Sequence, residues 1–299
     1  MSAETDLGLI GLGIMGSAIA RNLLAAGYRI VGFDIDAARC REMAGAGVVI
    51  VDSAGAVATA ATTILTSLPH DAALAETVRA VISAGAPART IVEMSTLAID
   101  SKLAAETALA EAGHTLLDCP LSGTGAQART KDLTVYASGD SRAIAAAAAI
   151  FAGFAKAHFD LGAFGNGSRM KYVANLLVFI HNVAAAEALV LGMKAGLDPA
   201  MIIEVVRHGA GGSRMLEVRG PAMAAGRYEP VTAGFPMYYK DLGVIGKFAM
   251  GLDCPTPLLS ACLPIYLAGG AAYPQSDVAA VCGVLEAMAG IKRPDGQAG

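Results

Sequence analysis

Short runs of β-branched and other apolar residues alternate with alanine-rich segments of helical length up to about residue 160. The apolar runs lie at residues 7–10, 29–33, 48–51, 63–68, 90–94, 115–118, 133–137 and 157–159. Segments between them, such as 15–26, 36–46 and 100–112, have the length of helices. This alternation predicts a mostly parallel, doubly wound sheet with right-handed crossovers.

The strand pattern stops after Gly165. Gly167 and Ser168 have the character of a helix start, and no Gly or Pro follows until Gly192, which predicts a helix of about 25 residues. Further helical stretches continue to about residue 289. We therefore expect an N-terminal α/β domain over residues 1–163 and a C-terminal all-α domain over residues 164–299, joined by the long helix.

The long helix carries apolar residues on every side, among them Leu176, Phe179 and Val183. A helix that is apolar all round is normally surrounded by protein. One small helical domain offers little cover, so the pattern favours a homodimer or homotetramer, with the C-terminal domain serving oligomerisation as well as substrate binding. The alternative is a monomer in which this helix is central.

Composition narrows the possible partners. With 22 basic and 26 acidic residues the net charge is −4, which argues against a nucleic-acid or acidic membrane partner. The uncharged stretch 254–276 contains four prolines, which argues against a membrane span. The acidic N-terminus lacks the layout of a signal peptide, so a cytoplasmic protein is expected.

Neither cysteines nor histidines are spaced as metal ligands. The five cysteines form no Cys-x-x-Cys pair, and the five histidines are scattered. We expect buried, reduced thiols and no metal site.

A glycine-rich motif follows the first apolar run. Residues 11–16 read Gly11-Leu12-Gly13-Ile14-Met15-Gly16, a Gly-x-Gly-x-x-Gly sequence between a strand and a helix. The first Gly permits a tight turn, the second lets a pyrophosphate approach the backbone, and the third allows close helix packing. The motif predicts a dinucleotide-binding domain of the Rossmann type.

Asp34 ends the second apolar run, 18 residues after Gly16. A carboxylate there accepts hydrogen bonds from the adenosine ribose and repels a 2′-phosphate, whereas the first basic residue downstream is Arg39. The cofactor is therefore predicted to be NAD, with NADP less favoured. The alternative role of Asp34 is to cap the following helix.

Four separated motifs resemble the β-hydroxyacid dehydrogenase family, whose members include 3-hydroxyisobutyrate dehydrogenases. They are the glycine motif with Asn22-Leu23, the segment Asp118-Cys119-Pro120-Leu121-Ser122-Gly123, the segment from Gly167 through Lys171 to Asn175, and Lys240-Asp241-Leu242. They occur in the family's order and cover almost the whole chain. The resemblance implies an oxidoreductase that transfers a hydride between NAD(H) and a small β-hydroxy acid or its semialdehyde or keto form.

Lys171 is the candidate general acid/base. Hydride transfer from an alcohol needs a base for the hydroxyl proton, and a desolvated lysine near an oxidised nicotinamide is suited to it. Asn175 lies one helical turn further and is expected to share a face with Lys171 and bind substrate. Ser122 and Gly123 follow a strand end and are expected to hold the substrate carboxylate. The alternatives are a solvent-exposed lysine, a packing asparagine and an ordinary Ser-Gly turn.

The resemblance implies further contacts. In the family, the loops that correspond to Leu68-Pro69 and Ser95-Thr96 touch the cofactor, and the lysine corresponding to Lys240 closes over cofactor and substrate. The chain departs from the family at Thr124, where a second Gly is usual, and at Arg214, where many relatives carry an aromatic residue. We expect Arg214 or Arg129 to meet a second anionic group of the substrate, or else to be a surface arginine.

Three other functions are less favoured by the residues. One is the decarboxylating chemistry of 6-phosphogluconate dehydrogenases, which normally carry His-Asn-Gly shortly after the lysine, where this chain has Ala174-Asn175-Leu176. Another is imine reduction, for which relatives usually lack the lysine. The last is a non-catalytic dinucleotide-binding scaffold, against which the retention of Lys171 with Asn175 argues.

Overall fold

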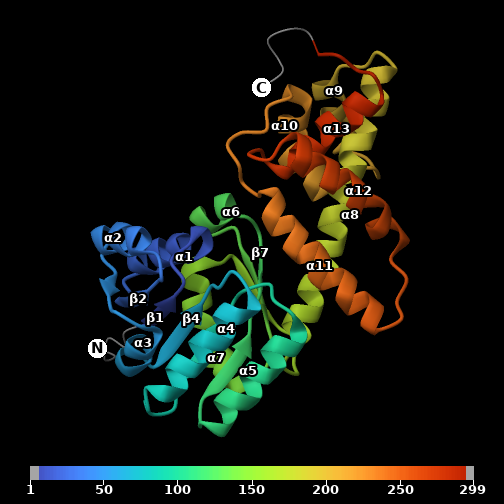
Figure 1. Ribbon diagram of the computed structural model, residues 1–299. Coiled ribbons are helices and arrows are strands. Elements are labelled where there is room, and N and C mark those ends of the chain that lie inside the picture. Colours follow the sequence, from blue (N-terminus) through green and yellow to red (C-terminus); the bar gives the residue numbers. More distant parts are fainter. Residues whose placement is uncertain (1–6, 294–299) are drawn as a thin grey trace. The chain divides into compact units, whose positions relative to one another are not determined.

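The computed structural model describes residues 7–293 and divides the chain into two compact units, Met1–Lys171 and Tyr172–Gly299 (Figure 1). Residues 1–6, on which the prediction about a signal peptide rests, lie outside the described residues. The boundary at residues 163 and 164 is kept as a proposal, because the long helix starts near it and runs through the division after Lys171.

The first unit contains a parallel sheet of six strands in the order β3-β2-β1-β4-β5-β6. The strands are β1 (Leu7–Ile10), β2 (Ile30–Phe33), β3 (Val49–Ile50), β4 (Thr63–Thr66), β5 (Thr90–Glu93) and β6 (Thr115–Asp118). The strand order reverses next to β1, so the carboxyl ends of β1 and β4 mark the switch point where ligands bind in such sheets. The doubly wound α/β fold expected from the sequence is confirmed.

A second, smaller sheet was not separated in the sequence-based expectation. It joins β7 (Leu121–Ser122), β8 (Thr134–Ala137) and β9 (Ala157–Asp160) in that order, with an antiparallel and a parallel pair. Strand β7 has only two residues, too short to give a periodic pattern. A single bridge from Asp118 to Ser138 links the end of β6 to this small sheet.

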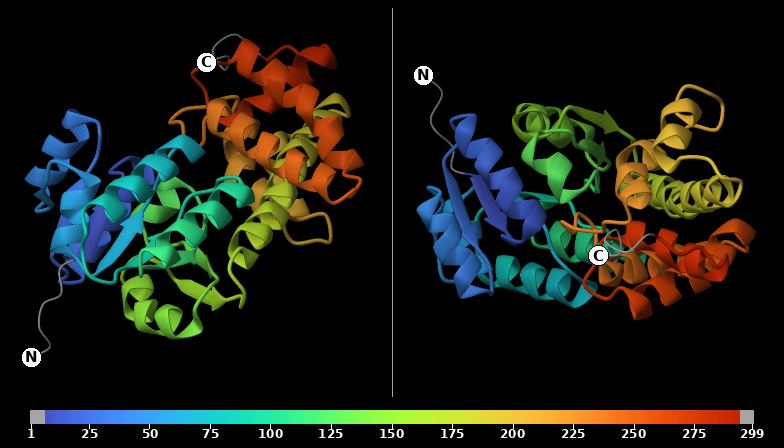
Figure 2. Two further views of the ribbon diagram at one scale, coloured as in Figure 1. Left: turned by 60° about the horizontal axis from the view of Figure 1, so that its bottom comes forward. Right: turned by 90° about the horizontal axis from the view of Figure 1, so that it is seen from above.

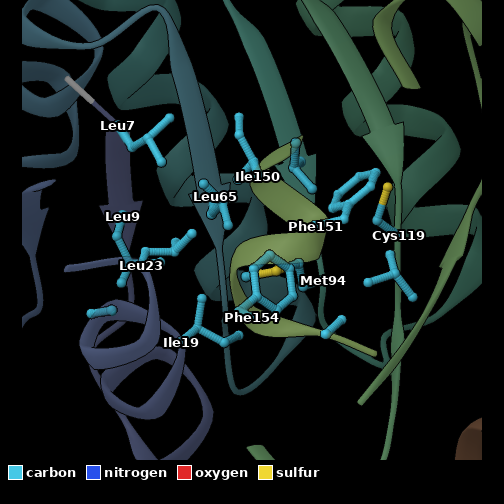
Figure 3. Close-up of a cluster of buried hydrophobic side chains, with 14 of the residues drawn as sticks. Leu7, Leu9, Ile19, Leu23, Leu65, Met94, Cys119, Ile150, Phe151 and Phe154 are labelled. Atoms are coloured by element: carbon cyan, nitrogen blue, oxygen red, sulfur yellow. The ribbon is translucent and has the colours of Figure 1, made fainter. Parts of the chain in front are cut away.

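Helices cover both faces of the large sheet (Figure 2). One buried cluster joins β1 and β4 to α1 and α7, and Figure 3 shows Ile19, Phe151 and Phe154 in it. The other joins the opposite side chains to α3, α4 and α5, with Val57, Val81 and Leu109 inside. The helices of this unit are α1 (Ile14–Ala25), α2 (Ala37–Gly45), α3 (Ala54–Ala60), α4 (Asp71–Ser83), α5 (Ile99–Glu111), α6 (Gly125–Arg129) and α7 (Ser141–Phe154).

The second unit is helical throughout its described residues, as the sequence predicts. Phe179, Tyr238 and Tyr266 pack edge to face or tilted in its interior, and the Asn182 amide donates to the Tyr266 hydroxyl at 3.1 Å. Its elements are α8 (Asn166–Lys194), α9 (Pro199–Val206), α10 (Arg214–Ala225), α11 (Phe235–Gly251), α12 (Pro257–Ala272), a 3-10 turn (Val278–Ala280) and α13 (Val281–Met288).

Helix α8 is longer and less evenly buried than expected. Within residues 7–293 it alone has the length and apolar composition that could cross a bilayer, and 39% of its most apolar window is buried inside the protein. Phe179, Ala186 and Leu189 are fully covered, so α8 is a core helix of its unit. The opposite side carries Val173, Leu177 and Leu191, which are 57%, 47% and 73% exposed.

Candidate active site

The glycine loop has the backbone that a dinucleotide requires. Gly11 has a φ of 91°, and a Cβ there would lie 2.1 Å from the carbonyl oxygen of Ser67. A Cβ on Gly16 would lie 1.9 Å from the carbonyl oxygen of Gly11, so α1 can approach the loop this closely only with glycine. Both positions therefore exclude a side chain for steric reasons.

The head of α1 has room for a phosphate group. Its N-cap is Gly13, which makes no side-chain capping hydrogen bond, and a Cβ on Gly13 would meet only the Arg39 guanidinium, at 3.4 Å. The first N–H groups of a helix then remain available to an anion. Leu12 is buried beneath the loop, Ile14 is 70% exposed and Met15 packs against the core. These residues fit the pyrophosphate of a dinucleotide.

Asp34, which the sequence predicts to bind the ribose, also stabilises this loop. Its Oδ2 accepts from the Leu12 N–H at 2.7 Å, and its Oδ1 accepts from the Asp36 N–H at 2.8 Å. The helix cap proposed as its alternative role belongs to Asp36, which accepts from the N–H of Ala38. The Arg39 guanidinium lies 3.7 Å from the Asp34 carboxylate. Sequence distance alone did not reveal that α2 brings Arg39 this close.

The two loops implied by the family resemblance are hydrogen-bonded to each other. The Leu68 N–H donates to the Ser95 hydroxyl at 2.7 Å, so the segments after β4 and β5 are joined. Pro69 is exposed and Thr96 is half-buried. Both loops leave the carboxyl edge of the sheet that also carries the glycine loop, which places these predicted cofactor residues on one side of the first unit.

Ser122 and Gly123 form the turn between β7 and α6. Gly123 has a φ of 134°, and a Cβ there would lie 2.5 Å from the Leu133 side chain, so the position requires glycine. Thr124, which departs from the family pattern, is the N-cap of α6 and forms a capping box with Gln127. Thr124 thus has a local structural role that explains the departure. Arg129 ends α6 and is exposed.

The cysteine in the same segment is inert. Cys119 is fully buried, and burial raises the pKa of its thiol well above the usual range, with the neighbouring Asp118 carboxylate adding to the shift. All five cysteines are free, and Cys262 and Cys282 are buried too. The expectation of uniformly buried thiols is wrong for Cys254, which is exposed after α11 ends, and only partly met at Cys40. Among the described residues no cluster of ligands could hold a metal ion.

Lys171 and Asn175 lie one turn apart on α8, and only 8% and 7% of them is exposed. The Asn175 amide nitrogen donates to Oδ2 of Asp241 at 3.0 Å, while the Lys240 ammonium lies 3.2 Å from Oδ1 of the same carboxylate. Asp241 therefore joins α8 to α11 and orients two predicted substrate residues. Sequence reasoning assigned no role to Asp241 beyond its place in the Lys240-Asp241-Leu242 motif. That motif was the one sign that Asp241 contributes to the site.

Arg214 forms an ion pair within its own helix. It is the first residue of α10, its side chain is 62% exposed, and its guanidinium lies 3.1 Å from the Glu217 carboxylate. Within the second unit, Asp241 thus links Asn175 and Lys240, whereas Arg214 pairs within its own helix.

Two family models match the chain. The NAD-binding domain of 6-phosphogluconate dehydrogenase matches residues 6–164, which is more than half of the chain. The NAD-binding domain of NADP-dependent 3-hydroxyisobutyrate dehydrogenase matches residues 165–285.

Curated relatives and solved structures agree with these models. L-threonate dehydrogenase of Cupriavidus necator is 32% identical over 88% of this chain and 89% of its own length. The 2-(hydroxymethyl)glutarate dehydrogenase of Eubacterium barkeri is 31% identical over 99% of this chain and 100% of its own. The structure of Mycobacterium tuberculosis 3-hydroxyisobutyrate dehydrogenase with L-serine superposes with a TM-score of 0.87, at 26% identity, over 95% of this chain and 99% of that one.

Proposed function

The chain belongs to the β-hydroxyacid dehydrogenase family, and we propose that Lys171 is the general acid/base of its hydride-transfer reaction. The protein is an NAD-dependent oxidoreductase that acts on the hydroxyl group of small hydroxy acids. The decarboxylating and non-catalytic alternatives are not favoured, because the relatives named above are dehydrogenases of hydroxy acids.

One observation carries the role of Lys171: a buried lysine one helical turn before a buried asparagine whose amide is held by a carboxylate. Lysine is seldom buried without a reason in chemistry or pairing. Because Asp241 binds the amide nitrogen of Asn175, the amide oxygen is left to accept a hydrogen bond from a ligand. Lys171 and Asn175 can then contact the same substrate hydroxyl.

Each residue then has a defined task. In oxidation the neutral Lys171 amine accepts the hydroxyl proton, and in reduction the ammonium returns it to the carbonyl oxygen. Ser122 and the backbone at Gly123 would hold the substrate carboxylate, and Lys240 would contribute a positive charge to cofactor and substrate. Bound NAD supplies the hydride acceptor. The cofactor would be held by the glycine loop, the ribose carboxylate, the two loops at the carboxyl edge of the sheet and one lysine of the second unit: Gly11, Leu12, Gly13, Ile14, Met15, Gly16, Asp34, Leu68, Pro69, Thr96 and Lys240.

The substrate we propose is a small β-hydroxy acid. The relatives that are named for L-threonate and 2-(hydroxymethyl)glutarate support a carboxylate that carries a hydroxyl group nearby. A guanidinium can bind a second carboxylate in a bidentate manner, so Arg214 or Arg129 is kept as a candidate for a second anionic group. Both arginines are exposed, each on its own unit, so either would suit only a substrate that reaches the surface of that unit.

We also propose a cytoplasmic homodimer or homotetramer. The exposed face of α8 carries Val173, Leu177 and Leu191, and α12 adds Leu258, Leu263 and Leu267, which are 63%, 42% and 52% exposed. Exposed apolar residues in such number are usually covered by a partner. A second copy of the chain is the partner that the long apolar helix favours.

The test is an assay of a panel of hydroxy acids with NAD and with NADP. We expect the native chain to form NADH, and Lys171→Ala to lower kcat by about 10²- to 10⁴-fold, the usual contribution of a general acid/base. Lys194→Ala, at the exposed end of the same helix, is the matched control and should keep the native kcat. The Kd for NADH, measured by fluorescence, should stay within about threefold in both variants, since this change is under 1 kcal/mol. Native turnover by the Lys171→Ala variant would refute the proposed role.

A further inference from the structure

Lys102 is a fully buried lysine that the proposed chemistry leaves unused. It lies in the first turn of α5 with 0% of its surface exposed. Its ammonium is 2.5 Å from the Glu93 carboxylate and 2.8 Å from the Asp118 carboxylate, and it donates to the Ser95 carbonyl at 2.7 Å. A cation in the first turn of a helix is disfavoured by the helix dipole, so helix stability does not explain its presence.

The ionisation of this lysine is secured by its partners. Burial by itself lowers the pKa of Lys102, but the adjacent Glu93 and Asp118 carboxylates outweigh burial and hold the pKa well above its usual value. A buried ion pair contributes little net stability compared with apolar groups of similar volume. This cluster therefore calls for an explanation other than stability.

The Glu93 side of the cluster reaches the loops predicted to hold the cofactor. Glu93 is the last residue of β5, and its Oε1 accepts from the Ser95 N–H at 2.9 Å. The Ser95 hydroxyl accepts from the Leu68 N–H. Lys102, by binding the Glu93 side chain and the Ser95 carbonyl, holds the segment that begins the loop at Thr96.

The Asp118 side of the cluster reaches the head of α8. Asp118 ends β6, and its Oδ2 accepts from the Ser168 N–H at 2.7 Å while its Oδ1 accepts from the Ser168 hydroxyl at 2.8 Å. The Ser138 hydroxyl lies between the Asp118 side chain and the Gly167 N–H, which donates to it at 2.9 Å. A Cβ on Gly167 would lie 2.3 Å from the Tyr136 carbonyl, so the first turn of α8 is also fixed by close packing.

We propose that Lys102 is a positioning residue for the reaction: through Glu93 and Asp118 it locks the Ser95-Thr96 loop and the first turn of α8, and so places Lys171 relative to the cofactor loops. Lys171 lies three residues after Ser168, in the next turn of the same helix. A small displacement of a reacting group lowers the reaction rate steeply. A buried cluster that fixes the start of α8 therefore protects the rate by keeping Lys171 in place. This inference rests on the proposed role of Lys171.

The test separates positioning from stability with the double variant Lys102→Met/Glu93→Gln. The two native residues carry opposite charges, so replacing both leaves the net charge of the cluster unchanged. The introduced glutamine can still accept from the Ser95 N–H, and the introduced methionine fills the space of the lysine stem, so the fold should be kept. What disappears is the ammonium that joins Glu93, Asp118 and the Ser95 carbonyl.

We expect the double variant to keep a melting temperature within about 5 °C of the native value, a change near 1–2 kcal/mol. Its kcat should fall at least tenfold, and amide exchange measured by mass spectrometry should quicken at least tenfold over residues 95–98 and 166–170. Arg21→Met, which breaks the exposed ion pair with Glu42, is the control and should change neither. Ser168→Ala, a milder change that keeps the backbone bond to Asp118, should lower kcat by about threefold to tenfold, the range of the net contribution of one ordinary hydrogen bond.

The inference is overturned if the folded double variant, or Ser168→Ala where the double variant fails to fold, keeps the native kcat and the native exchange. A failure of the proposed function would give a different result. If the proposed function were wrong, the native chain itself would oxidise none of the hydroxy acids, while the exchange measurement would still report whether Lys102 holds the two segments.

Discussion

Several single side chains in the first unit do more than one task. Asp34 accepts from the Leu12 N–H and from the Asp36 N–H, and its carboxylate is also the proposed ligand of the adenosine ribose. His114 accepts from the Arg89 N–H through Nδ1 at 3.1 Å, which requires that nitrogen to be unprotonated. Titration or replacement of such residues therefore changes local geometry and charge together.

Replacing Asp34 should relax the choice of cofactor. In Asp34→Ser the carboxylate that repels a 2′-phosphate is gone, while the Arg39 guanidinium beside it remains. We expect the ratio of kcat/KM with NAD to kcat/KM with NADP to fall at least about tenfold, or roughly 1.4 kcal/mol of discrimination. Glu42→Ser, at an exposed carboxylate on α2, the helix that carries Arg39, is the control. An unchanged ratio in Asp34→Ser would remove Asp34 from cofactor selection.

His114 should make the protein less stable in mild acid. Burial, with the Arg89 charge, lowers the pKa of His114 below its usual 6.5. Above pH 6.5 neither state binds the proton, and as the pH falls the unfolded chain binds it first, so stability is lost toward low pH. We expect His114→Asn to lose less melting temperature than the native chain between about pH 7.5 and pH 5.5. His208→Asn, at a histidine whose side chain is 69% exposed, should behave as the native chain does.

Whole elements in this protein approach each other at distances that only glycine permits. Helix α1 reaches the nucleotide loop through Gly16, and the first turn of α8 reaches the small sheet through Gly167. These contacts join backbone to backbone, so no side-chain rotation can relieve an added methyl group. The position of each helix start, and with it the direction of its first N–H groups, depends on the absence of a Cβ.

A methyl group at Gly16 should therefore weaken cofactor binding as well as the fold. Its Cβ would lie 1.9 Å from the Gly11 carbonyl oxygen, so Gly16→Ala has to displace α1 or the loop. We expect a loss of about 1–3 kcal/mol in the free energy of unfolding, as for overpacking, and at least a tenfold rise in the Kd for NADH. Gly45→Ala, in α2 with no atom within 4 Å of the added Cβ, should keep native binding. Calorimetry and NADH fluorescence measure the two effects.

At the scale of the molecule, each unit has its own core, and α8 belongs to both by sequence because its first residues lie before the division after Lys171. The exposed side of α8 repeats at residues 173, 177, 184, 187 and 191, which is one face of a helix. Apart from Glu187 this face is apolar. The exposed stripe thus extends along the helix that carries Lys171 and Asn175.

Charges placed on that stripe should disrupt the proposed assembly. We expect Leu177→Glu/Leu191→Glu to lower the mass measured by light scattering toward that of one chain, because carboxylates cannot be buried unpaired at an interface. Val205→Glu, an equally exposed apolar position on α9, is the control and should keep the native mass. A native chain that already runs as a monomer would contradict the oligomer.

Much of the fold and of the nucleotide site was readable from local pattern. The alternation of strands and helices, the long helix after Gly165 and the glycine loop each depend on residues close in sequence, where periodicity and backbone sterics act directly. Strand β7 was missed because two residues show no period. That α8 would not be fully covered by its own domain was expected, but which side is exposed was not, because an evenly apolar helix gives no sign of which side the chain itself covers.

The sequence alone thus determined the class of fold and predicted the place of the nucleotide and the residue types available for proton transfer, because motif spacing encodes local geometry. Only the tertiary structure decided that Arg39 reaches Asp34, that Asp241 holds Asn175, and that Lys102 lies between Glu93 and Asp118. These partners are brought together by the packing of separate elements, and the distance between charges in space cannot be read from their distance along the chain.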